Sequence, residues 1–276
     1  MVFRSIFVRA FVFLCLFPVS ASAADGSEDL VYQVSYNGIF SAGSEMPIVD
    51  MVLQTRLPHG QDGLTEISLR ASSVAYPLVE SLFPMRYHFR TWTGSNPDQL
   101  VGFETCEKTR KLKHRLYLRD TSAPGVRRYD LKAGNGRQEM EQLDAGVRPR
   151  AAAGGDPLFD YLGLMQRVRT LELEERAEYR FAVTDGRNPS IYRVRVEAAP
   201  LLKRDDRSVP AWKLRFDGLR PGPDGGEETV HRPFFVWLAR APARIPLRLE
   251  VRHTLGTFRA ELKRWPERDQ VARAGG

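Results

Sequence analysis

Few residue clusters in this chain could perform chemistry. No two of its five histidines lie within four residues of each other, so no local pair could bind a metal ion; they are His59, His88, His114, His231 and His253. The sequence contains no G-x-S-x-G, C-x-x-C, H-E-x-x-H or Walker-type glycine motif. We therefore predict a non-enzymatic protein without a metal or other cofactor. A hydrolase whose catalytic residues come from distant segments is the alternative.

A single cysteine, Cys106, follows the N-terminal region that holds Cys15. As a nucleophile, Cys106 would need a cationic or histidine neighbour to lower its pKa, and Lys108, Arg110 and His114 follow it. The ordinary alternative is a small buried residue on a strand. We expect the ordinary role.

The densest basic stretch of the chain reads KTRKLKHRLYLR, and its alternation predicts a strand. On such a strand Lys111, Lys113 and Arg115 share one face, and leucines occupy the other. This pattern fits an edge strand that charges protect against strand addition, or a stripe that binds phosphate or carboxylate groups. A stripe would require these side chains to lie on one exposed face beside Arg86 or Arg90.

A very apolar segment, FFVWL, precedes a turn and a further strand that begins I-P-L-R-L-E. Trp237 in this segment is either a core residue or an aromatic platform for a ligand. We treat Trp237, together with Lys111, Lys113, Arg115 and Arg86, as the candidate ligand-binding residues.

The N-terminus has the pattern of a cleavable signal peptide over residues 1–23. Arg4 and Arg9 give a positive start, an apolar run follows to Phe17, and A-S-A supplies the small residues of a cleavage site. The apolar run is much shorter than the ~20 residues of a transmembrane helix. We predict an exported, periplasmic protein without a transmembrane segment.

Composition limits the classes of protein that remain. Hydrophobic residues make up 42% of the chain and aromatic residues 10%, which excludes a disordered protein. Removal of residues 1–23 takes away two arginines and no acid, so the net charge falls from +7 to +5. Such a modest excess indicates solubility or attraction to an anionic surface, and it argues against nucleic acid as a partner.

Period-two alternation dominates the chain and predicts many strands, over residues 30–36, 48–57, 64–73, 85–92, 100–107, 109–120, 126–131, 179–184, 191–196, 212–217, 247–254 and 258–263. One segment differs: after Asp156, apolar residues recur at three- and four-residue spacing, which predicts an amphipathic helix over about Pro157–Thr170. A shorter helical turn is predicted over Tyr76–Leu82. The fold class is therefore mainly β, a strongly curved antiparallel sheet or open barrel with the helix on its concave face.

The predicted strands form one domain over residues 24–266, because neither half has its own helix cover. Residues 133–155 are rich in glycine and charge and are predicted to be a flexible insertion. Residues 267–276 are predicted to be a frayed tail.

Four segments of the chain resemble one bacterial envelope family, catalogued as domain of unknown function 3108. They are the opening strand at Tyr32–Ile39, the helix at Asp156–Arg169, the Val183–Gly186 turn with its following strand, and the closing hairpin at Trp237–Leu262. The resemblance implies an exported, non-enzymatic β-rich protein, distantly similar to the open-barrel lipoprotein carriers of the periplasm. It supplies no catalytic residues.

These observations give two functional hypotheses. The first is a periplasmic binding or carrier protein, a monomer, for an amphipathic envelope ligand such as a lipid, an acylated protein or a glycolipid, held in an apolar pocket under the helix. The second is a structural or assembly factor that binds another envelope protein or the cell wall through a strand edge or loop.

Overall fold

The computed structural model describes residues 27–41, 43–56, 63–94, 96–108, 112–120, 125–131, 156–186, 190–204, 207–221, 226–230, 232–240 and 244–263. The predicted signal peptide, the predicted insertion at residues 133–155, the predicted tail at residues 267–276 and Lys111 lie outside these residues.

Nearly all regular structure in the described residues is β-strand, as the alternation predicts. The strands are β1 (Ser27–Gly38), β2 (Met46–Arg56), β3 (Thr65–Ser72), β4 (Arg86–Thr93), β5 (Leu100–Lys108), β6 (Leu112–Arg119), β7 (Val126–Leu131), β8 (Glu178–Val183), β9 (Ser190–Ala198), β10 (Leu201–Arg204), β11 (Arg207–Pro221), β12 (Glu227–Thr229), β13 (Phe234–Ala239), β14 (Pro246–His253) and β15 (Gly256–Leu262). The helices are α2 (Pro77–Leu82) and α4 (Tyr161–Thr170).

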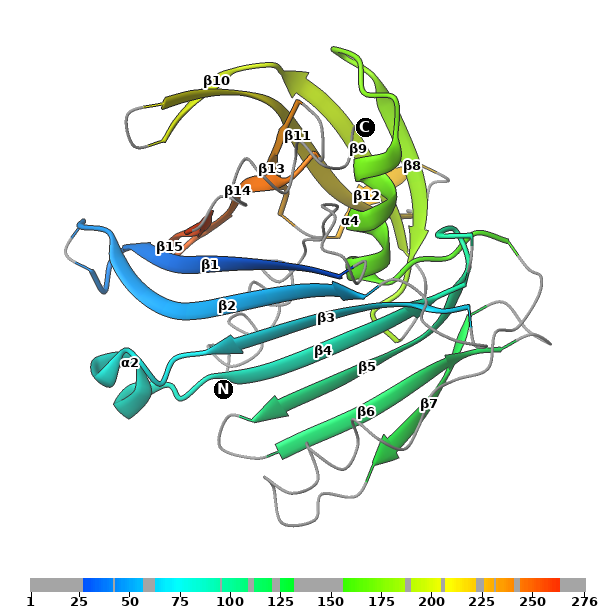
Figure 1. The fold of residues 1–276 in the computed structure, drawn as a ribbon, viewed down its shortest axis with the longest axis horizontal. Coiled ribbons are helices and arrows are strands. Elements are labelled where there is room, and N and C mark those ends of the chain that lie inside the picture. Colours follow the sequence, from blue (N-terminus) through cyan, green and yellow to red (C-terminus); the bar gives the residue numbers. More distant parts are fainter. Residues whose placement is uncertain are drawn as a thin grey trace.

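The strands join into a single antiparallel sheet that is not closed into a barrel. Its order is β7-β6-β5-β4-β3-β2-β1-β15-β14-β13-β11-β9-β8, and β10 and β12 pair only with β11. The last strand of the closing hairpin, β15, pairs with β1, so the first and last described strands are neighbours in the sheet. Figure 1 shows the sheet curling so that β1–β7 and β8–β15 face each other. The mainly β fold class is confirmed.

Alternation decides which side chains face the interior of this curl. In β1, Leu30, Tyr32, Val34 and Tyr36 are buried, and the residues between them are partly exposed. The Tyr32 hydroxyl donates a hydrogen bond of 3.0 Å to the carbonyl oxygen of Pro246 in β14. Its polar atom is therefore satisfied in the core.

Helix α4 begins at Tyr161, four residues after the predicted start. The Asp160 side chain, not that of Asp156, caps the helix by accepting a 2.9 Å hydrogen bond from the backbone N–H of Gly163. Leu158 and Phe159 instead form isolated parallel bridges to Gln99 and Val183, respectively. These bridges tie the segment before α4 to β8 and to the turn between β4 and β5, so the backbone stays extended until Asp160.

Helix α4 lies between the two facing parts of the sheet and packs on β4 and β8 (Figure 1). Its apolar face, made by Leu162, Leu164, Met165 and Val168, is part of the main hydrophobic core. Buried apolar side chains of this core surround α4 in the part of the chain that the structure describes. The short helix α2 confirms the helical turn predicted near Tyr76–Leu82.

Candidate functional site

Strand register separates the predicted basic residues between the two faces of the sheet. Residues directly opposite each other on neighbouring strands point to the same face. Lys113 lies opposite Glu107, which lies opposite Tyr87 in the core, so Lys113 faces the inside of the curl. Arg86 is one residue out of phase with Tyr87 and faces outward. Lys113 and Arg115 therefore do not meet the condition for an anion-binding stripe, which was one exposed face shared with Arg86 or Arg90.

Carboxylates accompany the basic residues on the inner face. Arg115 Nε lies 3.4 Å from Asp130 Oδ1 on β7. Burial raises the pKa of Glu107, and the charges of Lys113 and Arg115 oppose this rise. The described part of the basic strand thus alternates as predicted, but its cations are matched by acids.

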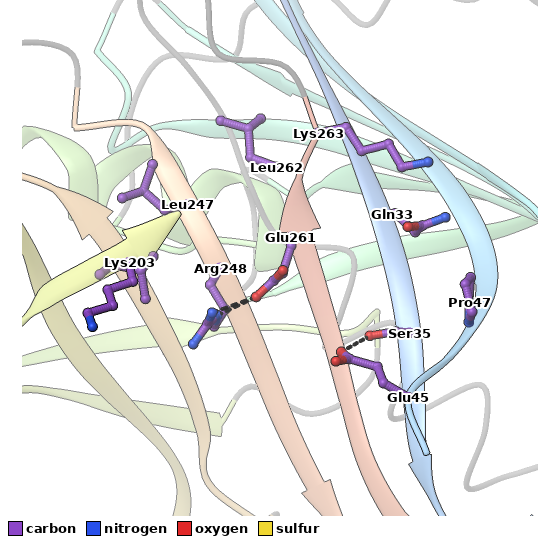
Figure 2. A pocket seen from close by; sticks show the side chains of 11 residues that line it. Gln33, Ser35, Glu45, Pro47, Lys203, Leu247, Arg248, Glu261, Leu262 and Lys263 are labelled. Atoms are coloured by element: carbon purple, nitrogen blue, oxygen red, sulfur yellow. Dashed lines mark hydrogen bonds and ion pairs between the residues drawn. The ribbon is translucent and has the colours of Figure 1, made fainter. Parts of the chain in front are cut away.

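A groove of about 450 Å³ lies on the outer face, where β14, β15 and β1 run side by side (Figure 2). Its floor is a cross-strand row in which Arg248 opposes Glu261 and Glu261 opposes Gln33. Four apolar residues and four further polar residues complete the lining; they are Leu202, Leu247, Leu262 and Pro47, and Lys203, Lys263, Ser35 and Glu45. We call this site the β1–β15 groove.

The charges of the β1–β15 groove are unequally neutralised. Arg248 is paired with Glu261, its Nε donating a 2.7 Å hydrogen bond to Oε1. Glu45 accepts a hydrogen bond from the Ser35 hydroxyl and lies 3.3 Å from Arg259. Lys203 is exposed at the edge of the groove. The groove therefore presents lysine at its mouth and an arginine–carboxylate pair on its floor.

Trp237 is not among the lining residues of this groove; it lies opposite Arg248 on the neighbouring strand β13. The residue is on the outward phase of β13, and its ring is covered by Lys213 Nζ at 5.8 Å and by the Arg248 guanidinium at 5.7 Å. Neighbouring Phe235 is covered in the same way by Lys213 and Arg252. The aromatic pair therefore positions the cations, Arg248 among them, through cation–π contacts.

A second groove, of about 290 Å³, lies on the outer face of β2 to β5, and Arg86 lines it. Two cross-strand rows form it: Val52, Arg70, His88 and Cys106, and then Asp50, Ser72, Arg86 and Lys108. We call this site the β2–β5 groove. Three of its cations come from three adjacent strands.

Cys106 is directly opposite His88 on one side and His114 on the other, in the residues that the structure describes. Of the described residues, these three come nearest to the alternative raised by the sequence, a thiol activated by a neighbouring histidine. The thiol is buried, and burial together with Glu104 and Glu107 raises its pKa to about 11. A neutral thiol is a weak nucleophile, so the geometry lacks the activation that thiol chemistry requires.

His114 and Arg90 both bind Glu104, which is buried on the outer face beside Cys106. Arg90 Nε donates a 2.7 Å hydrogen bond to Oε2, and His114 Nε2 donates to Oε1. Burial would raise the pKa of Glu104, but the hydrogen bond from His114 and the charge of Arg90 lower it overall. Three adjacent strands are thus tied by a satisfied charge cluster.

A different buried carboxylate, that of Glu28, lies on the inner side at the start of β1. Neither of its oxygens has a hydrogen-bond partner among the described residues. Burial raises the pKa of Glu28 to about 8, although the positive charge of Arg169 near the end of α4 opposes the rise. Arg169 itself donates a 3.1 Å hydrogen bond from Nε to the carbonyl oxygen of Arg244.

The lining of the β1–β15 groove was missed by sequence reasoning, apart from the alternation of its strands. Gln33, Lys203 and Lys263 come from segments 60 to 230 residues apart, and nothing in their local spacing links them. The only usable signal was the proline strand start at Pro246, which precedes Leu247 and Arg248.

In the part of the chain that the structure describes, no group of three or more histidine, cysteine, aspartate or glutamate side chains is arranged to hold a metal ion. The helices described there are too short or too polar to span a bilayer.

Comparison with solved structures finds distant β-rich likenesses. A β-barrel-like protein of domain of unknown function DUF1849 from Brucella abortus matches at 12% identity and a TM-score of 0.43, covering 85% of this chain and 94% of that one. A Bacteroides fragilis protein described as exported, with a YmcC-like fold, matches at 8% identity and a TM-score of 0.31, covering 91% and 99%. No curated protein matches.

The family model described as Protein of unknown function (DUF3108) matches residues 107–263. That segment runs from the end of β5 through α4 to the residue after β15, and it contains the helix and the closing hairpin on which the resemblance rested. It is more than half of the chain. The resemblance is confirmed, and the chain belongs to the DUF3108 family.

Proposed function

We propose that this protein is a periplasmic, non-enzymatic binding or carrier protein for an amphipathic envelope ligand, such as a lipid, an acylated protein or a glycolipid. The observation that carries the proposal is the β1–β15 groove. Its volume of about 450 Å³ lies within the ~300–1,000 Å³ of small-molecule sites. Its lining joins lysines and hydrogen-bonding side chains to four apolar residues, of which Leu202, Leu247 and Leu262 also belong to the buried main core.

The arrangement of charge in the groove favours an anionic head group. Lys203 lies on β10 and Lys263 directly follows β15, both in the lining of the groove, and Lys263 Nζ is 3.9 Å from a carboxylate oxygen of Asp50. At that distance the lysine ammonium keeps hydrogen bonds available for a phosphate or carboxylate oxygen. Gln33 donates to the Tyr76 hydroxyl at 2.7 Å, which orients its amide at the groove.

The binding site that we propose differs from the one predicted from the sequence, which was an apolar pocket under the helix. Helix α4, which was expected to cover the ligand, contributes its apolar face to the main core. We therefore place the ligand on the outer face, where the sheet curvature and β10 leave a hollow (Figure 2). Export to the periplasm is supported by the N-terminal signal pattern.

The proposal is tested by lipid analysis and by a competition assay. Native mass spectrometry of protein purified gently from the periplasm should find a co-purified lipid, and a fluorescent fatty acid should bind. The double variant Lys203→Gln/Lys263→Gln should bind the probe about tenfold more weakly, because two charge-assisted hydrogen bonds are lost. Arg220→Gln, an exposed site on β11, is the matched control. Absence of both lipid and probe binding in the wild type would refute the proposal.

The open sheet favours one second candidate, a structural or assembly factor. β7 lies at one end of the strand order, and its Tyr129 is exposed there. The outer edge of β7 pairs with no other described strand and could accept a partner strand, although Arg127 and Arg128 beside Tyr129 hinder such addition. A photo-crosslinking residue at position 129 should give one dominant protein adduct in cells if this candidate is right. Diffuse labelling would argue against it.

A further inference from the structure

Three arginines surround one aspartate on the outer face of the sheet, where β9 and β11 pair. In β9, the residues on either side of Arg193 and Arg195 belong to the main core, so both arginines face outward. Arg195 lies opposite Arg215 on β11. Arg193 lies opposite Asp217, two residues further along β11, so the four side chains share one patch. We call Arg193, Arg195 and Arg215 the arginine triad.

Asp217 holds the arginine triad together. Although this residue lies on the outer face, it is only 1% exposed. Its Oδ2 accepts a 3.0 Å hydrogen bond from Arg195 Nη2, and its Oδ1 accepts a 2.9 Å hydrogen bond from Arg215 Nε. Arg193 Nε is 3.9 Å from Oδ2, which is too far for a hydrogen bond. The carboxylate therefore fixes two guanidinium groups by hydrogen bonds and attracts the third by charge.

The arginine triad keeps hydrogen-bond donors for a further acceptor. Three guanidinium groups carry many more N–H donors than a single carboxylate can accept. Arg193 Nε is buried and has no hydrogen-bond partner among the described residues. The side chains of Arg193, Arg195 and Arg215 are 26%, 38% and 34% exposed, so the triad is reached from solvent but lies partly out of water. A guanidinium in such a position binds an anion more strongly than a fully exposed one.

The positive charge of the triad exceeds the negative charge beside it. In the part of the chain that the structure describes, Asp217 is the only carboxylate that forms an ion pair with the triad. Glu178, which is exposed on β8, lies opposite Arg195. Other carboxylates of this face have cations of their own; these pairs include Glu227 with Arg180, Glu197 with Lys213, and Glu250 with Arg252. With both Asp217 and Glu178 counted, the triad still has an excess of positive charge.

We infer that the arginine triad binds a phosphate monoester group, carried by a lipid head or by a small soluble molecule. The planar fork of a guanidinium matches two oxygens of a phosphate, and clustered arginines are suited to phosphate recognition. Asp217 positions the guanidinium groups before the ligand arrives, which reduces the cost of ordering them. Because Asp217 is buried, its carboxylate does not face the ligand. The triad is not part of the lining of the β1–β15 groove, so this inference goes beyond the proposed function.

Calorimetric titration of the mature chain with glycerol 3-phosphate tests this inference. The wild type should bind this phosphate monoester saturably. Arg193→Gln/Arg195→Gln should bind it at least about tenfold more weakly, because two charged hydrogen-bond donors are lost. In this variant Arg215 still donates to Asp217, so thermal unfolding should change little. Equal binding by the wild type and this variant would overturn the inference.

Three further variants make the titration specific to the triad. The control Arg127→Gln/Arg220→Gln removes the same charge at exposed positions on β7 and β11 and should bind as the wild type does. Arg193→Gln alone leaves both hydrogen bonds to Asp217 and should bind about threefold more weakly, which covers a double variant that fails to fold. Glu178→Gln removes the acid opposite Arg195 and should bind about threefold more tightly. Unchanged or weaker binding by Glu178→Gln would place the phosphate away from Arg195 and overturn the inference.

Vesicle co-sedimentation separates the two sources of the phosphate group. Binding to phosphatidylcholine vesicles that contain phosphatidic acid, if Arg193→Gln/Arg195→Gln abolishes it, assigns the phosphate to a lipid. Binding of glycerol 3-phosphate without binding to these vesicles assigns it to a soluble molecule. A wild type that binds neither would overturn the inference. The fluorescent fatty acid that probes the β1–β15 groove should bind the double variant normally, so a failure of the proposed function is distinguishable from a failure here.

Discussion

Two glutamates are buried in this protein near arginines, and their surroundings differ sharply. Glu104 receives hydrogen bonds from Arg90 and His114, and its pKa is lowered in spite of burial. Glu28 has no hydrogen-bond partner among the described residues, and burial raises its pKa to about 8 although Arg169 opposes the change. The same pair of residue types therefore gives an ionised carboxylate in one place and a protonated one in the other.

The difference comes from how each site is assembled. Arg90, Glu104 and His114 lie on three adjacent strands, and register brings Arg90 opposite Glu104. Glu28 lies on a strand and Arg169 on a helix, so their distance depends on how α4 packs. A buried charge is stabilised only when hydrogen bonds replace its lost hydration. Strand register supplied those bonds for Glu104, and helix packing did not supply them for Glu28.

The largest expected effect on the free energy of unfolding comes from removing Glu104 from its cluster with Arg90 and His114. Glu104→Ala should reduce the free energy of unfolding by about 3–5 kcal/mol, because Arg90 and His114 would remain buried without their partner. Chemical denaturation measures this loss, with Glu227→Ala on exposed β12 as the control. The triple variant Arg90→Met/Glu104→Leu/His114→Leu should lose less than Glu104→Ala alone. An equal loss in both variants would contradict the role given to unpaired charge.

Asp160 adds a third buried carboxyl to the comparison of Glu104 with Glu28. Hydrogen bonds alone satisfy it. It caps α4 and accepts a hydrogen bond from the Thr91 hydroxyl, and burial raises its pKa to about 6. Asp160→Ala should cost about 2 kcal/mol, since the helix loses its cap and Thr91 loses its partner. Asp160→Asn keeps an acceptor for the helix and should cost less. Denaturant unfolding of the two variants at neutral pH should separate them; equal costs would count against the cap.

The Glu28 carboxyl predicts a pH dependence of opposite sign to that of an ordinary ion pair. The folded protein holds this proton up to about pH 8, whereas the unfolded chain releases it near the ordinary pKa of 4.5. The folded state therefore binds more protons between these values, and stability should fall as the pH rises through that window. Glu28→Gln cannot titrate, and it should be more stable than the wild type at pH 9 by on the order of 1 kcal/mol.

Thermal or denaturant unfolding between pH 5 and 9 checks this prediction. The difference between Glu28→Gln and the wild type should grow with pH. Thr55→Val, opposite Glu28 on β2, changes the same buried region without a titratable group and serves as the control. A constant difference across the range would show that Glu28 is ionised in the folded protein.

The smallest expected effect belongs to the partly exposed pair of Glu80 and Arg86. Hydrogen bonds from Arg86 and Ser73 lower the pKa of Glu80 to about 2. Its stabilising contribution is therefore present above about pH 4.5 and is lost as the pH falls toward 2. Solvent screening limits that contribution, so Glu80→Gln should cost no more than about 1 kcal/mol at neutral pH. A loss of unfolding free energy as large as that of Glu104→Ala would mean that the attachment of α2 stabilises the sheet as a whole.

Much of the fold was predictable because alternation is a local property. The alternation around Tyr32, His88 and Leu249 predicted their strands, and the spacing from Leu158 to Val168 predicted a helix. The start of that helix was not predictable from local spacing. Asp156 followed by proline is a good cap signal, but bridges from Leu158 and Phe159 to distant strands keep the backbone extended as far as Asp160.

The sequence by itself determined which residues of each strand share a face, since successive side chains of a strand point in opposite directions. It therefore predicted the split between Lys113 and its leucine neighbours. Only the tertiary structure decided which of those faces points inward and which strands meet. Strand order and register depend on contacts between segments as distant as β1 and β15. Those contacts put Arg86 and Lys113 on opposite faces, and they bring Gln33, Arg248 and Lys263 to one groove.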